Sequence, residues 1–172
     1  LFIDKALDDL TEAETRSLTR RRPPAEPELR RTVARLLKRA PEAGDTALHM
    51  AAYENNVAAA RALMIAGADP NVKNNNQMTP LLVAAQNGYE NVVEILVEND
   101  GNPNATDSEG MTALHWAAHK GYPDVARVLL EHGANPDIPD DGNQKPLDIA
   151  RMKLNDDVAA ILKRHGATGY GQ

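Results

Sequence analysis

The sequence predicts an all-α fold, a solenoid of stacked helix-turn-helix units joined by short β-hairpin or turn fingers. Two observations lead to this prediction. A pattern of residues recurs along the chain at a constant step, and each copy carries leucine and alanine at helical spacing. One such unit is too small to bury its own apolar face, so successive copies must stack into a continuous core.

The repeat is clearest between residues 110 and 137, and its main positions recur through the chain. The position expected to begin the first helix of each copy is occupied by Thr46, Thr79, Thr112 and Lys145. Two apolar positions follow at the same step, namely Leu48, Leu81, Leu114 and Leu147, then Ala51, Ala84, Ala117 and Ala150. Four copies in phase are the signature of a repeat architecture.

The motif Thr-Pro/Ala-Leu-His-x-Ala-Ala with a 33-residue period resembles the ankyrin repeat. The resemblance covers about residues 44–168, in four copies over 44–76, 77–109, 110–142 and 143–168. It implies an ankyrin-repeat solenoid that serves as a protein-protein interaction module.

The third copy illustrates why these residues suit two short helices. Thr112 is placed as an N-cap, whose hydroxyl accepts a hydrogen bond from a backbone N–H of the first turn. Leu114 and Ala117 lie on one helical face, and the small alanine lets a second helix approach closely. Gly121 ends the first helix, and Gly133 follows the second at a position that favours a left-handed conformation.

Residues 1–43 precede the phased repeats, and their apolar spacing predicts further helices. Thr11 and Glu14 have the spacing of a capping box for a short helix. We interpret residues 28–40 as the second helix of a degenerate N-terminal capping repeat, with a finger shortened by seven residues relative to the other copies. Residues 1–22 are expected to be an added helical element that covers the open end of the stack.

The copies depart from the motif in ways that predict local differences. Repeat two has Asp100 where the other copies have glycine, with Gly101 one place later, so we expect its second helix to end at a shifted position. Repeat four carries polar Asp148 and Arg151, which suit the water-facing side of a terminal repeat. Trp116 is expected to pack between repeats, and the tail, residues 169–172, is expected to be loose.

The composition fits one domain with an aliphatic core. The 172 residues are 42% hydrophobic and include one Phe, one Trp and no cysteine, which excludes disulfides and thiolate chemistry. No run of 18 apolar residues is present, so we expect no membrane partner. A cytoplasmic location is expected, with a secreted effector or a periplasmic protein as alternatives. The chain begins at Leu1, which leaves open that it is a fragment of a larger protein.

The histidines indicate structural roles. The resemblance implies that His49 and His115, at the motif's histidine position, bond to neighbouring backbone and hold the fingers in place. His132 and His165 precede helix-ending glycines, where a partial positive charge suits the helix C-terminus.

We predict no catalytic residue, no cofactor and no metal site. His115 and His119 have the i, i+4 spacing of two zinc ligands, but Trp116 stands where the metalloprotease motif needs glutamate. A catalytic zinc would also need a third ligand, which no motif specifies. The two serines, Ser17 and Ser108, lie outside any nucleophile-elbow sequence. The chain is therefore not expected to be an enzyme.

Charge is unevenly distributed along the chain. Residues 16–39 contain nine Lys or Arg and two acids, whereas residues 44–172 contain nine basic and seventeen acidic residues. Solvated helix faces account for this pattern most simply. A basic patch for nucleic acid or for an acidic partner is the alternative, but no recognition motif supports nucleic acid.

The resemblance places the partner-binding surface on the finger tips and the first helices, which form the concave side of an ankyrin stack. Mapping by motif position gives Asn75, Asn76, Met78, Glu109, Met111, Asp141 and Gln144 from the fingers, and Tyr53, Glu54, Gln86, Asn87, His119, Lys120 and Met152 from the helices. We expect Tyr53, Met78, Met111 and Met152 to be exposed apolar anchors, since methionine and tyrosine suit adaptable recognition.

The preferred hypothesis is therefore an adaptor, regulator or effector that acts as a monomer and binds another protein. The alternative is a regulatory or targeting fragment of a larger enzyme. The third hypothesis is that the basic residues 16–39 bind nucleic acid or an acidic partner.

Overall fold

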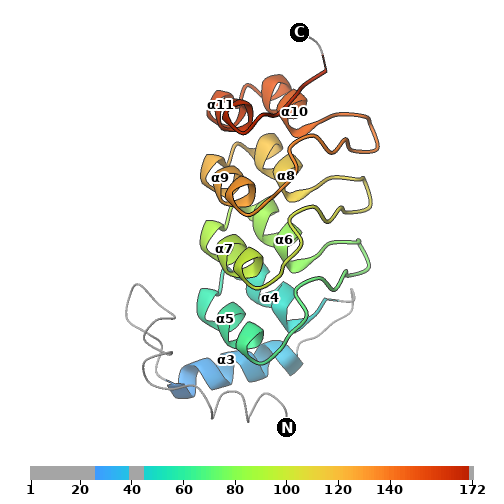
Figure 1. Cartoon of the computed structure of the whole chain (residues 1–172). Coiled ribbons are helices and arrows are strands. Elements are labelled where there is room, and N and C mark those ends of the chain that lie inside the picture. The colour runs from blue at the N-terminus through green and yellow to red at the C-terminus, as the bar shows by residue number, and fades with distance from the viewer. Residues whose placement is uncertain (1–25, 39–44, 171–172) are drawn as a thin grey trace.

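The computed structural model describes residues 26–38 and 45–170, and within them the fold is an all-α solenoid (Figure 1). Four helix pairs follow one another: α4 (Ala47–Tyr53) with α5 (Val57–Ile65), α6 (Pro80–Asn87) with α7 (Glu90–Glu98), α8 (Ala113–Lys120) with α9 (Pro123–Glu131), and α10 (Pro146–Met152) with α11 (Asp156–Arg164). No strand is assigned in these two ranges. The helical element predicted for residues 1–22 lies outside them.

The pairs repeat at the step that the sequence predicts. The first helices begin at Ala47, Pro80, Ala113 and Pro146, which are equivalent positions of successive repeats. They form one column, the second helices form a parallel column, and the fingers project beside the first helices (Figure 1). Each helix packs against its partner and against the corresponding helix of the next repeat.

The first helices end at residues with left-handed backbone conformation, as the glycines in the sequence predict. Gly88 and Gly121, at the ends of α6 and α8, have φ values of 75° and 77°. Leu154 occupies the same position in the fourth repeat with φ 58° and a side chain that is 82% exposed. A bulky residue is strained in this region of the backbone map.

The second helix of repeat two ends in phase with the others, so the predicted shift is wrong. Helix α7 ends at Glu98, the position equivalent to Ile65 at the end of α5. Asp100 itself adopts the left-handed conformation, with φ 63°, as Gly67 does with φ 83°. Aspartate is one of the few non-glycine residues that visit this conformation routinely.

Helix α3 (Glu26–Lys38) covers the N-terminal end of the stack. It packs against α4 and α5 (Figure 1). Leu29, Val33 and Leu36 are almost completely buried. The helix predicted over residues 28–40 is therefore present as far as Lys38, where the described range ends, and its apolar side belongs to the common core.

A ladder of side-chain hydrogen bonds links the loops that follow the second helices. At one position of each loop, a side-chain oxygen accepts a backbone N–H from the next repeat. The bonds run from Asn102 to Asn71 Oδ1 at 2.8 Å, from Asn135 to Asn104 Oδ1 at 2.7 Å and from Thr168 to Asp137 Oδ1 at 2.8 Å. The last rung thus has a carboxylate where the inner rungs have amides.

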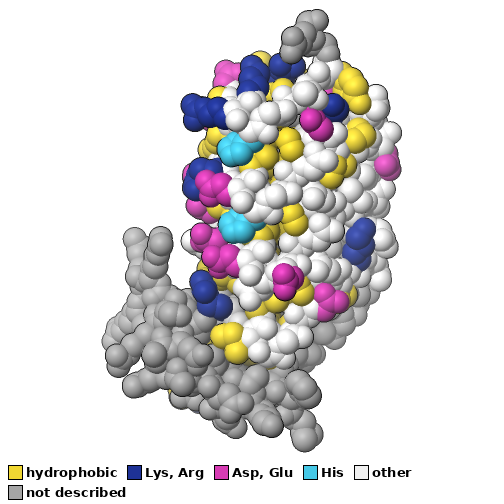
Figure 2. All heavy atoms as spheres, in the orientation of Figure 1, with side chains coloured by type: hydrophobic (Ala, Val, Ile, Leu, Met, Phe, Trp, Pro, Cys, Tyr) yellow, Lys and Arg dark blue, Asp and Glu magenta, His cyan; other side chains and the backbone are white. Residues whose placement is uncertain are grey.

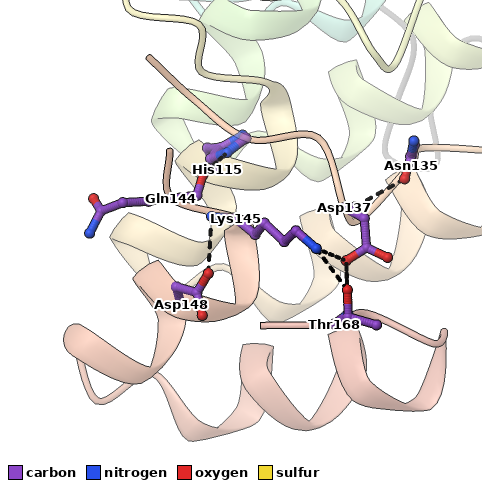
Figure 3. Close-up of polar contacts among 7 residues, drawn as sticks. All are labelled: His115, Asn135, Asp137, Gln144, Lys145, Asp148 and Thr168. Atoms are coloured by element: carbon purple, nitrogen blue, oxygen red, sulfur yellow. Dashed lines mark hydrogen bonds and ion pairs between the residues drawn. The ribbon is translucent and has the colours of Figure 1, made fainter. Parts of the chain in front are cut away.

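Lys145 makes several contacts with the end of the fourth repeat. Lys145 Nζ donates to Thr168 Oγ1 at 2.8 Å and lies 3.4 Å from Asp137 Oδ1 (Figure 3). The same ammonium group lies 4.8 Å from the centre of the Tyr170 ring. Of the tail predicted over residues 169–172, the structure describes Gly169 and Tyr170, and Tyr170 contacts the last repeat through Lys145.

Candidate binding site on the fingers and first helices

The predicted site residues lie in rows that cross the repeats. The last turn of each first helix presents one equivalent residue, namely Tyr53, Gln86, His119 or Met152. Tyr53 and Met152 are 66% and 60% exposed, and Gln86 and His119 are partly exposed. Lys120 beside them is exposed. The row predicted from the helices is therefore accessible.

Each finger is shaped by one asparagine or aspartate at its base. Asn74 Oδ1 accepts hydrogen bonds from the backbone N–H groups of Asn76 and Met78, both at 3.0 Å. Asp107 occupies the same position in the next finger and accepts both equivalent bonds, and Asp140 in the fourth finger accepts the one from the N–H of Gln144. The exposed residues among those mapped on the fingers include Asn75, Asn76, Glu109 and Asp141.

Direct bonds join the fingers to the first helices, so the two sets of residues share one face. Trp116 Nε1 on α8 donates to Asp107 Oδ2 at 3.0 Å. Gln144 Nε2 on the fourth finger donates to Met152 Sδ at 3.4 Å. The mapped residues of fingers and helices are thus brought together.

Met78 and Met111 are not the exposed anchors that the sequence predicts. Their exposed fractions are only 9% and 8%. Each precedes an N-cap threonine, and each has its backbone N–H and carbonyl bonded to the base of its own finger. That hairpin-like closure holds both side chains on the inner side of the finger, so the predicted continuous apolar line is interrupted.

Two other mapped residues have partners within the molecule. Glu54 forms a two-point ion pair with Arg35 of α3, with N–O distances of 3.0 and 2.8 Å. Asn87 Nδ2 donates to the carbonyl of Val83 at 2.8 Å. Both side chains therefore help to hold the fold.

A hollow of about 340 Å³ lies between the first two repeats on this face. Its lining includes three of the mapped residues that remain accessible, Tyr53, Asn76 and Gln86. The described lining also includes the mapped but buried Met78. Its remaining residues, which no motif position assigned to binding, are Asp45, His49, Met50, Asn74 and Val83.

The hollow exists because the repeats differ at one position. Val83 of α6 and Trp116 of α8 occupy equivalent positions of successive repeats. The half-buried indole of Trp116 packs on the core and bonds to the third finger. We expected it to pack between repeats, but it is not fully enclosed there. The smaller Val83 leaves the equivalent space beside the second finger open.

His49 and His115 have the structural role that the resemblance implies. His49 Nδ1 accepts the N–H of Thr46 at 3.0 Å, and Nε2 donates to the carbonyl of Met78 in the next repeat at 2.8 Å. His115 makes the same bond to the N–H of Thr112 at 3.0 Å. Its Nε2 donates to the carbonyl of Gln144 at 3.0 Å (Figure 3). Burial lowers the pKa of both imidazoles, although the accepting carbonyls and nearby carboxylates oppose this shift.

His119 has a different environment. Its ring lies edge-on to Trp116, with ring centres 6.3 Å apart. Burial, followed by the charges of Lys153 and Lys120, lowers the pKa of His119. Because both ring nitrogens of His115 are already bonded, the i, i+4 histidine pair is not set up to bind zinc. Residues 26–38 and 45–170 contain no cluster of three or more metal-ligating side chains.

The second helices present a charged surface on another side of the stack. Arg127 of α9 contacts Glu90 of α7 and Asp124, both at 3.2 Å. Figure 2 shows basic and acidic side chains alternating along the edge formed by these helices. No helix in the described part of the chain is long and apolar enough to cross a lipid bilayer.

Comparison with known proteins defines the class of protein. A family model described as ankyrin repeats (3 copies) matches residues 28–107, 48–140 and 100–169. These matches cover most of the chain, so the chain belongs to the ankyrin-repeat family, a non-catalytic module that generally mediates protein-protein interaction.

One relative is human transient receptor potential cation channel subfamily A member 1. The two sequences are 38% identical over 56 residues, which amount to 33% of this chain and 5% of the channel. The matched segment is thus about a twentieth of that much longer protein.

Proposed function

We propose that this protein is an adaptor, regulator or effector that binds a partner protein on the face made by its fingers and first helices. The hollow between the first two repeats is the observation that carries the proposal. It is lined jointly by α4, α6 and the second finger, and Tyr53 stands 66% exposed at its edge. An exposed aromatic residue beside a recess is the kind of anchor that interfaces use.

The energetic centre of the face is expected at repeats one and two. Tyr53, Asn76 and Gln86 lie around the hollow, whereas Met78 and Met111 are buried and would affect folding if changed. Binding energy concentrates in a few anchors surrounded by residues that exclude water. Glu109, Lys120, Asp141 and Met152 extend the surface toward the C-terminal end.

The proposal is tested by capturing a partner with the whole chain and titrating it against two matched variants. Tyr53→Ala with Gln86→Ala should weaken binding by about 1–3 kcal/mol without changing the melting temperature by more than a few degrees. Glu94→Ala with Arg127→Ala, on the second helices, should leave the affinity nearly unchanged. The proposal fails if the second-helix pair abolishes binding and the Tyr53 pair does not.

The second candidate is that the chain is a regulatory or targeting fragment of a larger enzyme. The channel match, confined to 5% of a long protein, shows that similar repeats occur within longer chains. The complete coding sequence would distinguish this candidate from an independent adaptor. Binding of nucleic acid through residues 16–39 is less well supported, since Arg35 of that segment is paired with Glu54.

A further inference from the structure

We propose that the hollow between repeats one and two is a subsite for a cationic side chain of the partner, with arginine as the preferred residue. The inference rests on the proposed function, because it names the group that the same face receives. It is carried by a carboxylate, an aromatic ring and an apolar wall that meet in one recess, those of Asp45, Tyr53 and Met50.

The charge of the hollow favours a cation. Among the lining residues that the structure describes, Asp45 has the one carboxylate, and none is lysine or arginine. His49 supplies no positive charge, since both its ring nitrogens are bonded in the neutral form and burial lowers its pKa. A cation that enters the hollow therefore meets the Asp45 carboxylate without competition from a basic side chain of the described lining.

Asp45 is held in place by the second finger. Asn74, only 8% exposed, donates from Nδ2 to Asp45 Oδ1 at 2.7 Å. The other amide atom, Asn74 Oδ1, is fixed by the N–H groups of Asn76 and Met78. A carboxylate has about four acceptor positions, so Asp45 keeps the capacity to receive donors from a ligand.

The remaining walls suit the stem and the plane of an arginine. The apolar side chains of Met50, Met78 and Val83 would contact the methylene groups, as apolar surfaces commonly do for long basic residues. The exposed Tyr53 ring would stack against the guanidinium group. The planar guanidinium group of arginine can donate to a carboxylate and also to amide oxygens such as those of Asn76 and Gln86. The ammonium group of lysine is a point charge and lacks this geometry.

The other repeats lack this combination. The residues equivalent to Asp45 are Met78, Met111 and Gln144, none of which carries a charge. In the next inter-repeat space, Asp107 Oδ2 already accepts the indole N–H of Trp116. The subsite is therefore specific to the first two repeats.

The experiment is an NMR titration of the full chain with a capped Gly/Ser peptide that contains one central arginine. Parallel peptides carry citrulline, lysine or norleucine at that position. We expect saturable shifts confined to residues 45–53 and 74–86 with the arginine peptide, weaker shifts with lysine, and none with citrulline or norleucine at equal concentration. Asp45→Asn should weaken arginine binding about tenfold, as expected for loss of a charge-assisted hydrogen bond.

Val83→Trp provides a second variant, because tryptophan stands naturally at this position in the next repeat. It should close the hollow and abolish the arginine-dependent shifts while the melting temperature stays near that of the wild type. Asp141→Asn, which removes an acid from another finger, is the matched control and should change nothing. If Val83→Trp fails to fold, Asp45→Asn and its control still decide the matter.

Three results would overturn the inference: equal binding of norleucine, shifts centred on Glu109 and Asp141, or no saturable shift with arginine. If the peptide fails while Tyr53→Ala with Gln86→Ala still weakens the captured partner, only the arginine subsite is wrong. If those two substitutions also leave the partner's affinity unchanged, the binding face itself is wrong.

Discussion

At the scale of single residues, His49 and His115 show how one side chain can join two repeats. Each imidazole accepts the N–H of its own N-cap residue and donates to a backbone carbonyl of the following repeat. Both bonds require the neutral ring with its proton on Nε2. Repeat two has Leu82 at the equivalent position, also fully buried, and so lacks this connection.

The neutral histidines should make the stability of the protein depend on pH. Their folded-state pKa values lie below the unfolded value of about 6.5. Protonation of these histidines therefore favours the unfolded chain. Their contribution to stability is fully present above about pH 6.5 and is lost as the pH falls through their folded-state pKa values. Denaturant midpoints measured between pH 7.5 and pH 5 should decrease.

The variant His49→Leu with His115→Leu isolates this contribution, because leucine occurs naturally at the same position in repeat two. At neutral pH each substitution should cost about 1 kcal/mol for the lost hydrogen bonds. The decrease of the midpoint toward pH 5 should become shallower. A double variant with the same pH dependence as the wild type would assign that dependence to other groups.

At the scale of the elements, the helix ends are determined by backbone conformation. One equivalent position at the end of the first helix is left-handed in all four repeats, and it is occupied by Asn55, Gly88, Gly121 or Leu154. Gly88 and Gly121 are the helix caps themselves, whereas Asn55 and Leu154 follow the caps Glu54 and Lys153. The position two residues after each second helix is also left-handed in all four repeats, and it is occupied by Gly67, Asp100, Gly133 or Gly166. The periodic chain path thus imposes a conformation that some of its residues do not favour.

Glycine should stabilise the protein at Leu154 and at Asp100, and by unequal amounts. Left-handed backbone costs an ordinary L-residue roughly 1–2 kcal/mol, and aspartate less. Leu154→Gly should therefore raise the free energy of unfolding by about 1 kcal/mol, and Asp100→Gly by a smaller amount. Urea denaturation of the two variants measures both. Gly133→Ala is the reverse control and should be destabilising, and a destabilised Leu154→Gly would show that the exposed leucine makes a compensating contact.

At the scale of the whole molecule, the stack needs a cover at its N-terminal end. The apolar side of α3 provides it, because Leu29, Val33 and Leu36 pack on the first repeat and leave polar residues outside. A solenoid with an exposed terminal interface is prone to association. The matched family segment that begins at residue 28 includes most of this helix.

Weakening this cover should destabilise the protein and promote association. Leu36→Ala should cost about 2–5 kcal/mol as a large-to-small change in the core. Arg31→Ala, on the exposed side of the same helix, should have little effect. Thermal denaturation and size-exclusion chromatography measure the two consequences. An unchanged melting temperature for Leu36→Ala would show that α3 does not stabilise the stack.

Much of the fold could be predicted because its determinants are local and repeated. Thr79, Thr112 and the helix-ending glycines act within one turn of the chain, and four copies supply the same information. The phase of α7 could not be predicted in the same way, because Asp100 considered alone suggests a displaced helix end. Its neighbours in the stack instead keep the helix in register and force the residue into the left-handed conformation.

The candidate site was predictable only in part, because exposure depends on neighbouring repeats. Motif position correctly placed Tyr53 and Gln86 on an accessible face, but it could not show that Met78 and Met111 turn inward. The hollow depends on a contrast between repeats, Val83 against Trp116. A column-by-column comparison of the four copies contains that signal, and also identifies Asp45 as the single charged residue in its column.

The ladder of loop residues has a mechanical consequence. Its inner rungs are amide hydrogen bonds, which ionic strength affects little, whereas the last rung combines the Asp137 carboxylate with the Lys145 ammonium group. Salt screens such a partly exposed ion pair. Under tension, the fourth repeat should therefore detach at a force that falls with salt, while the interior of the stack resists with a force that does not.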